Sequence, residues 1–191
     1  MSANHKLDKN WIFILSAAGS LIASFLLDGY VLRFFTYLRE SFRSNILDLV
    51  MGIFSSYLIA GAVLVLYLML LVKRRDARIA NLALGGFAAT FLISFLIKVL
   101  FARARPSPMP DIPLLRVPDF SFPSMHAALA FSTLPFVKRH FKRQSELWMA
   151  GCCLVAFSRL YFSVHYLSDV VGGILLGLAV GGAFLRWEKR K

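Results

Sequence analysis

Residues 79–101 read IANLALGGFAATFLISFLIKVLF and carry one charged side chain, Lys98, in 23 positions. About 20 mostly apolar residues are enough for a helix to cross a bilayer, so this stretch predicts a membrane-spanning helix. An ionisable side chain inside such a segment is costly to keep there. Lys98 is therefore the first candidate for a functional residue.

The rest of the chain repeats this apolar pattern. Its 191 residues are 58% hydrophobic, above the usage of ordinary soluble domains. We expect an all-α polytopic membrane protein in which six transmembrane helices form one bundle, and a single domain over 1–191 with a motif-bearing core at 98–169. The six spans are predicted near 11–32, 47–72, 79–101, 122–137, 146–163 and 167–186.

The net charge of +12 is distributed unevenly about these spans. With the N-terminus inside, one side holds 14 of the 22 basic residues: Lys6, Lys9, Lys73, Arg74, Arg75, Arg78, Lys138, Arg139, Lys142, Arg143, Arg186, Lys189, Arg190 and Lys191. Such a bias is typical of cytoplasmic loops and predicts that both termini are cytoplasmic. The basic residues flank spans in short loops, so we expect no nucleic-acid partner.

Three polar clusters interrupt the apolar chain, and topology places all of them at the outer surface. They are Lys98 with Arg105-Pro106, then Pro123-Ser124-Met125-His126, then Ser158-Arg159 with His165 and Asp169. The second cluster begins a helix at which Pro suits the first turn and Ser124 can act as the cap. Unpaired N–H groups at such a helix start bind phosphate well.

The third cluster is the most specific. His165 and Asp169 are four residues apart, so the carboxylate can reach one imidazole nitrogen and leave the other free to attack. We predict phosphoryl transfer with a catalytic set of His165, His126 and Asp169. The phosphate-binding residues would be Lys98, Arg105, Ser124, Met125 and Arg159, and the supporting residues Pro106, Pro123 and Ser158.

In this reaction His165 would attack phosphorus in line and His126 would protonate the leaving oxygen. The carboxylates near the site are Asp169, already assigned to His165, and Asp111 and Asp119 in the proline-rich segment 102–121. A di-metal phosphatase needs more carboxylates than these. We therefore expect neither a metal nor another cofactor.

The three clusters together resemble the membrane-bound type 2 phosphatidic acid phosphatases, which are related to bacterial acid phosphatases and vanadium haloperoxidases. That family's signature is Lys-x6-Arg-Pro, Pro-Ser-Gly-His and Ser-Arg-x5-His-x3-Asp. The chain departs from it at Met125, where the family has Gly, and a Cβ and thioether there would alter the pocket shape. The resemblance implies metal-independent hydrolysis of lipid phosphates or diphosphates.

The substrate classes that fit are phosphatidic acid, phosphatidylglycerol phosphate, polyprenyl diphosphate and lipid A phosphates. Two alternatives stay open: a lipid phosphotransferase that uses the same phosphohistidine, and a non-catalytic protein that binds or transports lipid headgroups. We expect a cell inner membrane location with the site on the periplasmic side. Gly173, Gly177 and Gly181 form a small-residue face that favours packing within the monomer or, alternatively, a homodimer.

Overall fold

The computed structural model of the chain describes residues 2–42, 44–56, 65, 77–107 and 120–188, and these contain helices and no strand. The helices are α1 (Ser2–Ser41), α2 (Asn45–Ser55), α4 (Ala77–Phe101), α5 (Met125–His140), the 3-10 turn η1 (Lys142–Gln144), α6 (Ser145–Tyr161) and α7 (Leu167–Glu188). The prediction of an all-α fold is confirmed for the described residues.

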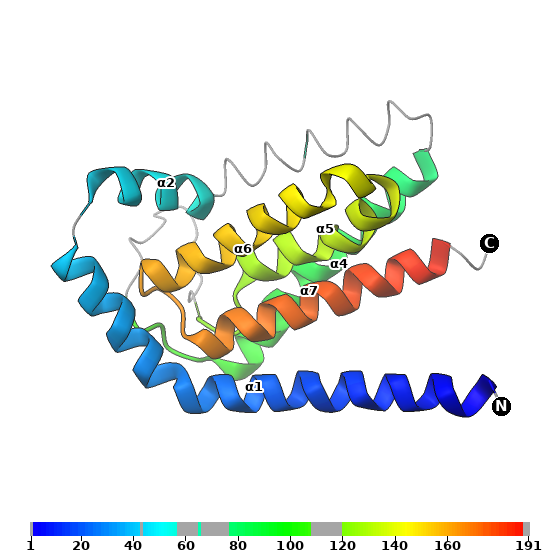
Figure 1. Ribbon diagram of the computed structural model, residues 1–191, viewed down its shortest axis with the longest axis horizontal. Coiled ribbons are helices and arrows are strands. Elements are labelled where there is room, and N and C mark those ends of the chain that lie inside the picture. The colour runs from blue at the N-terminus through cyan, green and yellow to red at the C-terminus, as the bar shows by residue number, and fades with distance from the viewer. Residues whose placement is uncertain (1, 43, 57–64, 66–76, 108–119, 189–191) are drawn as a thin grey trace.

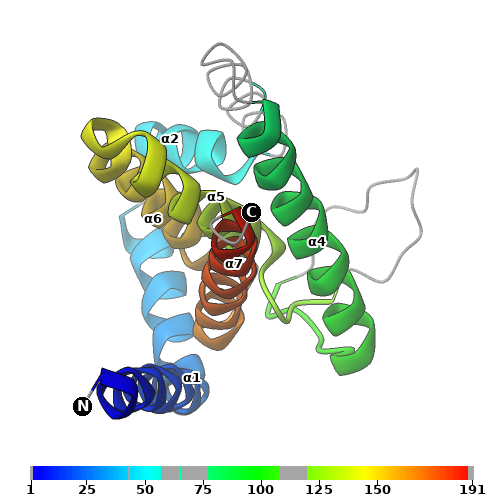
Figure 2. The ribbon, with the colours of Figure 1, turned by 90° about the vertical axis from the view of Figure 1, so that its right-hand side faces the viewer.

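Helix α7 lies at the centre of the arrangement. It packs against α5, α4, α1 and α6, and the end-on view shows these helices around it (Figure 2). Helix α1 follows one side of the bundle and then turns across its end, while α2 lies over α6 (Figure 1). The start of α1 and the end of α7 lie at the same end of the bundle (Figure 1).

Two predicted spans differ from the helices observed. The first, placed at 11–32, continues as one helix to Ser41. The second, placed at 47–72, is not one unbroken helix, because α2 ends at Ser55 and Ser56 has extended backbone with φ −78° and ψ 129°. The rest of that predicted span lies outside the described residues, apart from Val65.

The glycine face of α7 is used inside the molecule. A Cβ at Gly173 would lie 2.5 Å from the carbonyl oxygen of Ser124, and at Gly177 and Gly181 it would overlap backbone carbonyls of α5 even more severely. The two helix backbones therefore meet here without side chains between them. The alternative of a homodimer through Gly173, Gly177 and Gly181 is wrong, since α5 already covers this face.

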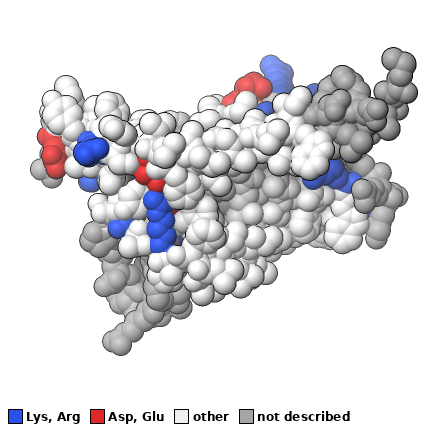
Figure 3. All heavy atoms as spheres, turned by 90° about the horizontal axis from the view of Figure 1, so that it is seen from below, with Lys and Arg blue, Asp and Glu red and all other residues white. Residues whose placement is uncertain are grey.

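The outer surface of the helices is apolar. Leu15, Leu26, Leu92 and Leu100 are between 59% and 80% exposed. On the face shown in Figure 3, a wide uncharged area separates the charged side chains gathered toward the two ends. Three described helical segments are long and apolar enough to cross a membrane: Ile14–Ser41, Arg78–Phe101 and Leu167–Trp187. Helices α5 and α6 have 16 and 17 residues and are shorter than a full span.

Candidate active site

The three polar clusters meet at the end of the bundle away from the start of α1 and the end of α7 (Figure 1). The backbone N–H of Ser124 donates to the carbonyl of Asp169 at 2.9 Å, which joins the start of α5 to the start of α7. The guanidinium of Arg105, which follows α4, lies 2.9 Å from the imidazole of His165. Residues from widely separated parts of the chain therefore form one group, as the sequence predicted.

His165 lies in the connection between α6 and α7, with its side chain held between a guanidinium and a carboxylate. Nη1 of Arg105 is 2.9 Å from Nε2, and Oδ2 of Asp169 is 3.4 Å from Nδ1. A guanidinium can only donate, so Nε2 accepts and the ring proton sits on Nδ1. Nε2 therefore has the lone pair that a nucleophile needs, and it points toward Arg105.

The surroundings of His165 keep its ring neutral. Burial lowers the pKa of His165 well below its usual value of 6.5, and the nearby positive charges of Arg105, Arg159 and Lys98 lower the pKa further. A protonated imidazole has no lone pair with which to attack. The cations that would bind a phosphate thus also keep His165 in its reactive form.

His126 and Arg159 are linked through Ser55 at the end of α2. The imidazole of His126 donates to the backbone carbonyl of Ser55 and lies within electrostatic reach of Arg159, His165 and Arg105. Nη1 of Arg159 donates to both the hydroxyl and, at 3.3 Å, the carbonyl of Ser55. Both predicted histidines therefore face the same group of cations, and α2 closes one side of it.

Lys98 and Arg105 approach the group from the end of α4. Lys98 is buried, and its ammonium donates to the backbone carbonyl of Phe120. Arg105 donates to the carbonyl of Val164 at 2.8 Å as well as to His165. The backbone from Phe120 onward and the connection before α7 therefore fix the two basic side chains that the sequence singled out.

Ser124 occupies the N-cap position of α5, as predicted, but its hydroxyl makes no capping hydrogen bond. This hydroxyl is fully buried and has no hydrogen-bond partner within the described part of the chain. Met125, which follows it, is the first residue of α5 and is also buried. The prediction of a helix start is confirmed, whereas the expected cap is wrong.

The predicted supporting residues have ordinary structural surroundings. Pro123 is fully buried and leads into α5, and Pro106 is half-buried after the end of α4. The hydroxyl of Ser158 donates to the carbonyl of Val155 in its own helix at 2.8 Å. The hydroxyl of Ser158 is therefore satisfied within its own helix.

Sequence reasoning missed four polar residues next to the site: Ser55, Arg103, Asp28 and Ser168. Arg103 donates to Asp169 at 2.8 Å and to Asp28 of α1, also at 2.8 Å. Asp28 is a carboxylate inside an otherwise uncharged stretch of α1, and this was the one signal that could have drawn attention to it. Ser55 and Ser168 carry no comparable signal in the sequence.

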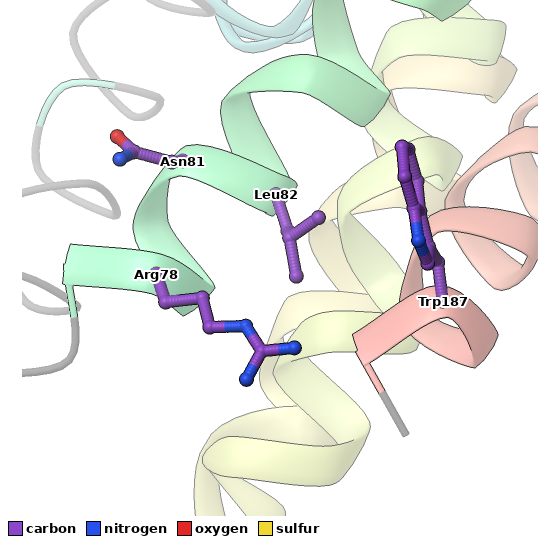
Figure 4. Close-up of a pocket in the computed structure, with 4 residues that line it drawn as sticks. All are labelled: Arg78, Asn81, Leu82 and Trp187. Carbon is purple, nitrogen blue, oxygen red and sulfur yellow. The ribbon is translucent and has the colours of Figure 1, made fainter. Parts of the chain in front are cut away.

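A pocket of about 410 Å³ lies elsewhere, lined by Arg78, Asn81, Leu82 and Trp187 (Figure 4). Arg78 precedes Lys98 by 20 residues on α4, which corresponds to about 30 Å of helix. This pocket is therefore separate from the candidate site. Among the described residues, no group of three or more His, Cys, Asp or Glu side chains is arranged to hold a metal ion.

Comparison with known proteins identifies the class. Residues 78–191 match the model of the PAP2 superfamily. The chain is 30% identical over 129 residues to a lipid A 4'-phosphatase of Porphyromonas gingivalis, a match covering 60% of this chain and 55% of the relative. It is 30% identical over 154 residues to the undecaprenyl-diphosphatase BcrC of Bacillus subtilis, and this match covers 78% of each.

A similar solved structure is described as the first transmembrane PAP2 type phosphatidylglycerolphosphate phosphatase from Bacillus subtilis. It has a TM-score of 0.67 and 24% identity, and 94% of each chain is covered. The protein described here belongs to the PAP2 superfamily. It is a multi-pass membrane protein with the fold of these phosphatases, although it spans only about half the length of the lipid A phosphatase.

Proposed function

We propose that this protein hydrolyses a lipid phosphate or diphosphate through a phosphohistidine intermediate, without a metal ion. The observation that carries the proposal is the position of His165, whose Nδ1 faces Asp169 while Nε2 faces Arg105. The carboxylate orients the ring, and Arg105 lies where it can bind the phosphate that Nε2 attacks. The phosphatase relatives support the same reaction class.

The first step forms a bond between Nε2 of His165 and phosphorus while the bond from phosphorus to the lipid oxygen breaks. His126, protonated also on Nε2, the nitrogen that does not face Ser55, gives this second proton to that leaving oxygen. Lys98, Arg105 and Arg159 neutralise the charge on the equatorial oxygens, as phosphoryl transfer requires. The Ser124 hydroxyl supplies a further donor, because it has no partner within the described residues.

The second step returns the enzyme to its starting state. Water attacks phosphorus, His126 takes the proton from that water, and the bond between phosphorus and Nε2 of His165 breaks. Asp169 keeps the proton on Nδ1 of His165 throughout, so His165 returns to its starting tautomer when its bond to phosphorus breaks. The products are inorganic phosphate and a lipid alcohol, or a lipid monophosphate when the substrate is a diphosphate.

We place the site at the outer face of a cell inner membrane, with six spans and both termini in the cytoplasm. Three apolar helices of sufficient length and the excess of basic residues in the predicted cytoplasmic loops support this orientation. The site also lies at the end of the bundle opposite the start of α1 and the end of α7 (Figure 1). A lipid substrate would reach it sideways from the outer leaflet.

The relatives act on lipid A and undecaprenyl diphosphate by name, and both belong to the substrate classes expected from the sequence. The test is release of inorganic phosphate from phosphatidic acid, phosphatidylglycerol phosphate, undecaprenyl diphosphate and lipid A, in detergent with a chelator. We expect turnover of at least one lipid, and none by His165→Ala. A strict requirement for a divalent metal, or full activity of His165→Ala, contradicts the proposal. Transfer of the phosphate to another lipid without release would indicate a phosphotransferase.

A further inference from the structure

Arg103 connects the site to the first helix of the bundle. Its Nη1 donates to Oδ1 of Asp169 at 2.8 Å and to the hydroxyl of Ser168 at 2.6 Å, while its Nη2 donates to Oδ2 of Asp28 at 2.8 Å. The guanidinium also lies over the ring of Tyr166, 4.0 Å from its centroid. One cation is therefore held by two carboxylates, one from α1 and one from α7.

Asp28 completes the arrangement from the other side. Its Oδ1 accepts the backbone N–H of Ser168 at 2.8 Å, and its Oδ2 accepts the Ser168 hydroxyl at 2.6 Å together with Arg103. Both carboxylate oxygens are thus occupied, and the first turn of α7 is tied to α1. Asp28 and Ser168 are buried, so water competes little for these bonds.

The carboxylate of Asp169 is divided between two tasks. Oδ1 accepts from Arg103, whereas Oδ2 accepts the N–H of Tyr166 at 2.8 Å and faces Nδ1 of His165 at 3.4 Å. Because a carboxylate is planar, fixing Oδ1 fixes the direction of Oδ2. The position of Arg103 therefore sets the direction from which Asp169 meets the His165 ring.

We infer that Arg103 and Asp28 are positioning residues for the reaction, acting through Asp169 on His165. This inference rests on the proposed function, because it assigns the pair a part in that reaction. Arg103 and Asp28 bond to Asp169, to Ser168 and to each other, and among the described residues neither bonds to a histidine of the site. Arg103 orients the carboxylate of Asp169. Asp28, which is 75 residues away in the chain, in turn orients the guanidinium of Arg103. The transition state needs the ring in one orientation, so these residues act on kcat more than on substrate binding.

The test compares Arg103→Gln, Arg103→Lys and Asp28→Asn with wild type, using a lipid phosphate that wild type hydrolyses. Arg33→Gln is the matched control, since Arg33 is an exposed arginine on α1. We expect Arg103→Gln to lower kcat about 10- to 100-fold with KM within about threefold of wild type. Arg103→Lys keeps the positive charge but not the planar guanidinium that bonds two carboxylates at once, so it should retain an intermediate kcat.

A merely structural role would behave differently, and the Asp169→Asn background reveals it. If Arg103 acts through Asp169, adding Arg103→Gln to Asp169→Asn should lower kcat little further, because the carboxylate through which Arg103 acts is already missing. Elution from gel filtration and the melting temperature in detergent show whether each variant is folded. If Arg103→Gln does not fold, Arg103→Lys and Asp28→Asn carry the same comparison.

The possible failures are separable. If wild type releases no phosphate, or His165→Ala is as active as wild type, the proposed function fails and the inference with it. If those two behave as proposed but Arg103→Gln keeps the wild-type kcat, only the inference is overturned. Equal losses from Arg103→Gln in wild type and in the Asp169→Asn background also overturn it.

Discussion

Replacing Asp169 with Asn tests how the carboxylate holds His165. The change keeps the size of the side chain and removes one acceptor. In the wild type, Arg103 donates to Oδ1 of Asp169, while the Tyr166 N–H and Nδ1 of His165 face Oδ2. An asparagine side chain offers one oxygen and one NH2 group, so in either orientation its N–H faces a donor.

The size of the effect follows from the tautomer of His165. If the new NH2 faces the ring, Nδ1 must accept, and the ring proton moves to Nε2. That nitrogen then loses the lone pair for attack and turns an N–H toward the Arg105 guanidinium 2.9 Å away. In serine protease triads the equivalent change lowers kcat about 10⁴-fold. We expect a loss of about 10³- to 10⁴-fold here, or about 4 to 5 kcal/mol in the barrier.

The assay is steady-state phosphate release in detergent, with the chelator present. Asp48→Asn is the matched control, because Asp48 also forms an ion pair with a guanidinium, that of Arg39, and accepts from the hydroxyl of Tyr161, but lies outside the site. We expect that variant to stay within about threefold of wild type. A folded Asp169→Asn protein that retains more than a tenth of the wild-type kcat would refute the reasoning.

Three further predictions concern the packing and the polar groups of the site. Gly177→Ala should destabilise the protein by about 1 to 3 kcal/mol, because its Cβ would overlap a carbonyl of α5. Gly182→Ala should not, because its Cβ would meet nothing within 4 Å. Melting temperatures in detergent compare the two variants, and equal values would contradict the close packing of α5 and α7. Ser124→Ala should leave the melting temperature unchanged, since the hydroxyl has no partner in the described residues to lose. It should lower kcat/KM about tenfold, because the proposed donor to the phosphate is removed. An unchanged kcat/KM would exclude a role in phosphate binding. Because the pKa of His165 is lowered in the folded state, the unfolded chain takes up the proton first. Stability should therefore fall as the pH drops below about 6.5, and His165→Gln should flatten that part of the melting-temperature profile; an unchanged slope contradicts the neutral ring.

The convergence of the polar clusters could be predicted because each one lies at a helix end. Helices that alternate in direction bring their ends to two surfaces, so His126 and His165 had to share a face once the spans were placed. The pairing of His165 with Asp169 followed from their four-residue spacing. These inferences needed only local patterns and the direction of each span.

The link through Arg103 could not be predicted in this way. Asp28 lies 75 residues before Arg103, and no spacing rule connects them. The break at Ser56 was also hidden, because the apolar run from 47 to 72 contains no proline, and an isolated glycine such as Gly52 is tolerated inside a helix. The sequence also left open which helix packs against the α7 glycines. A small-residue face fits any close neighbour, and only the tertiary packing identifies that neighbour as α5.

Trapping the phosphoenzyme tests the central claim most directly. Wild-type protein is mixed with a lipid carrying labelled phosphate, quenched in alkali within one turnover, and digested for peptide mapping by mass spectrometry. We expect an alkali-stable, acid-labile phosphate on the peptide containing His165, and none in His165→Gln. Label on another residue, or full turnover with no labelled protein under these conditions, would contradict a mechanism through His165.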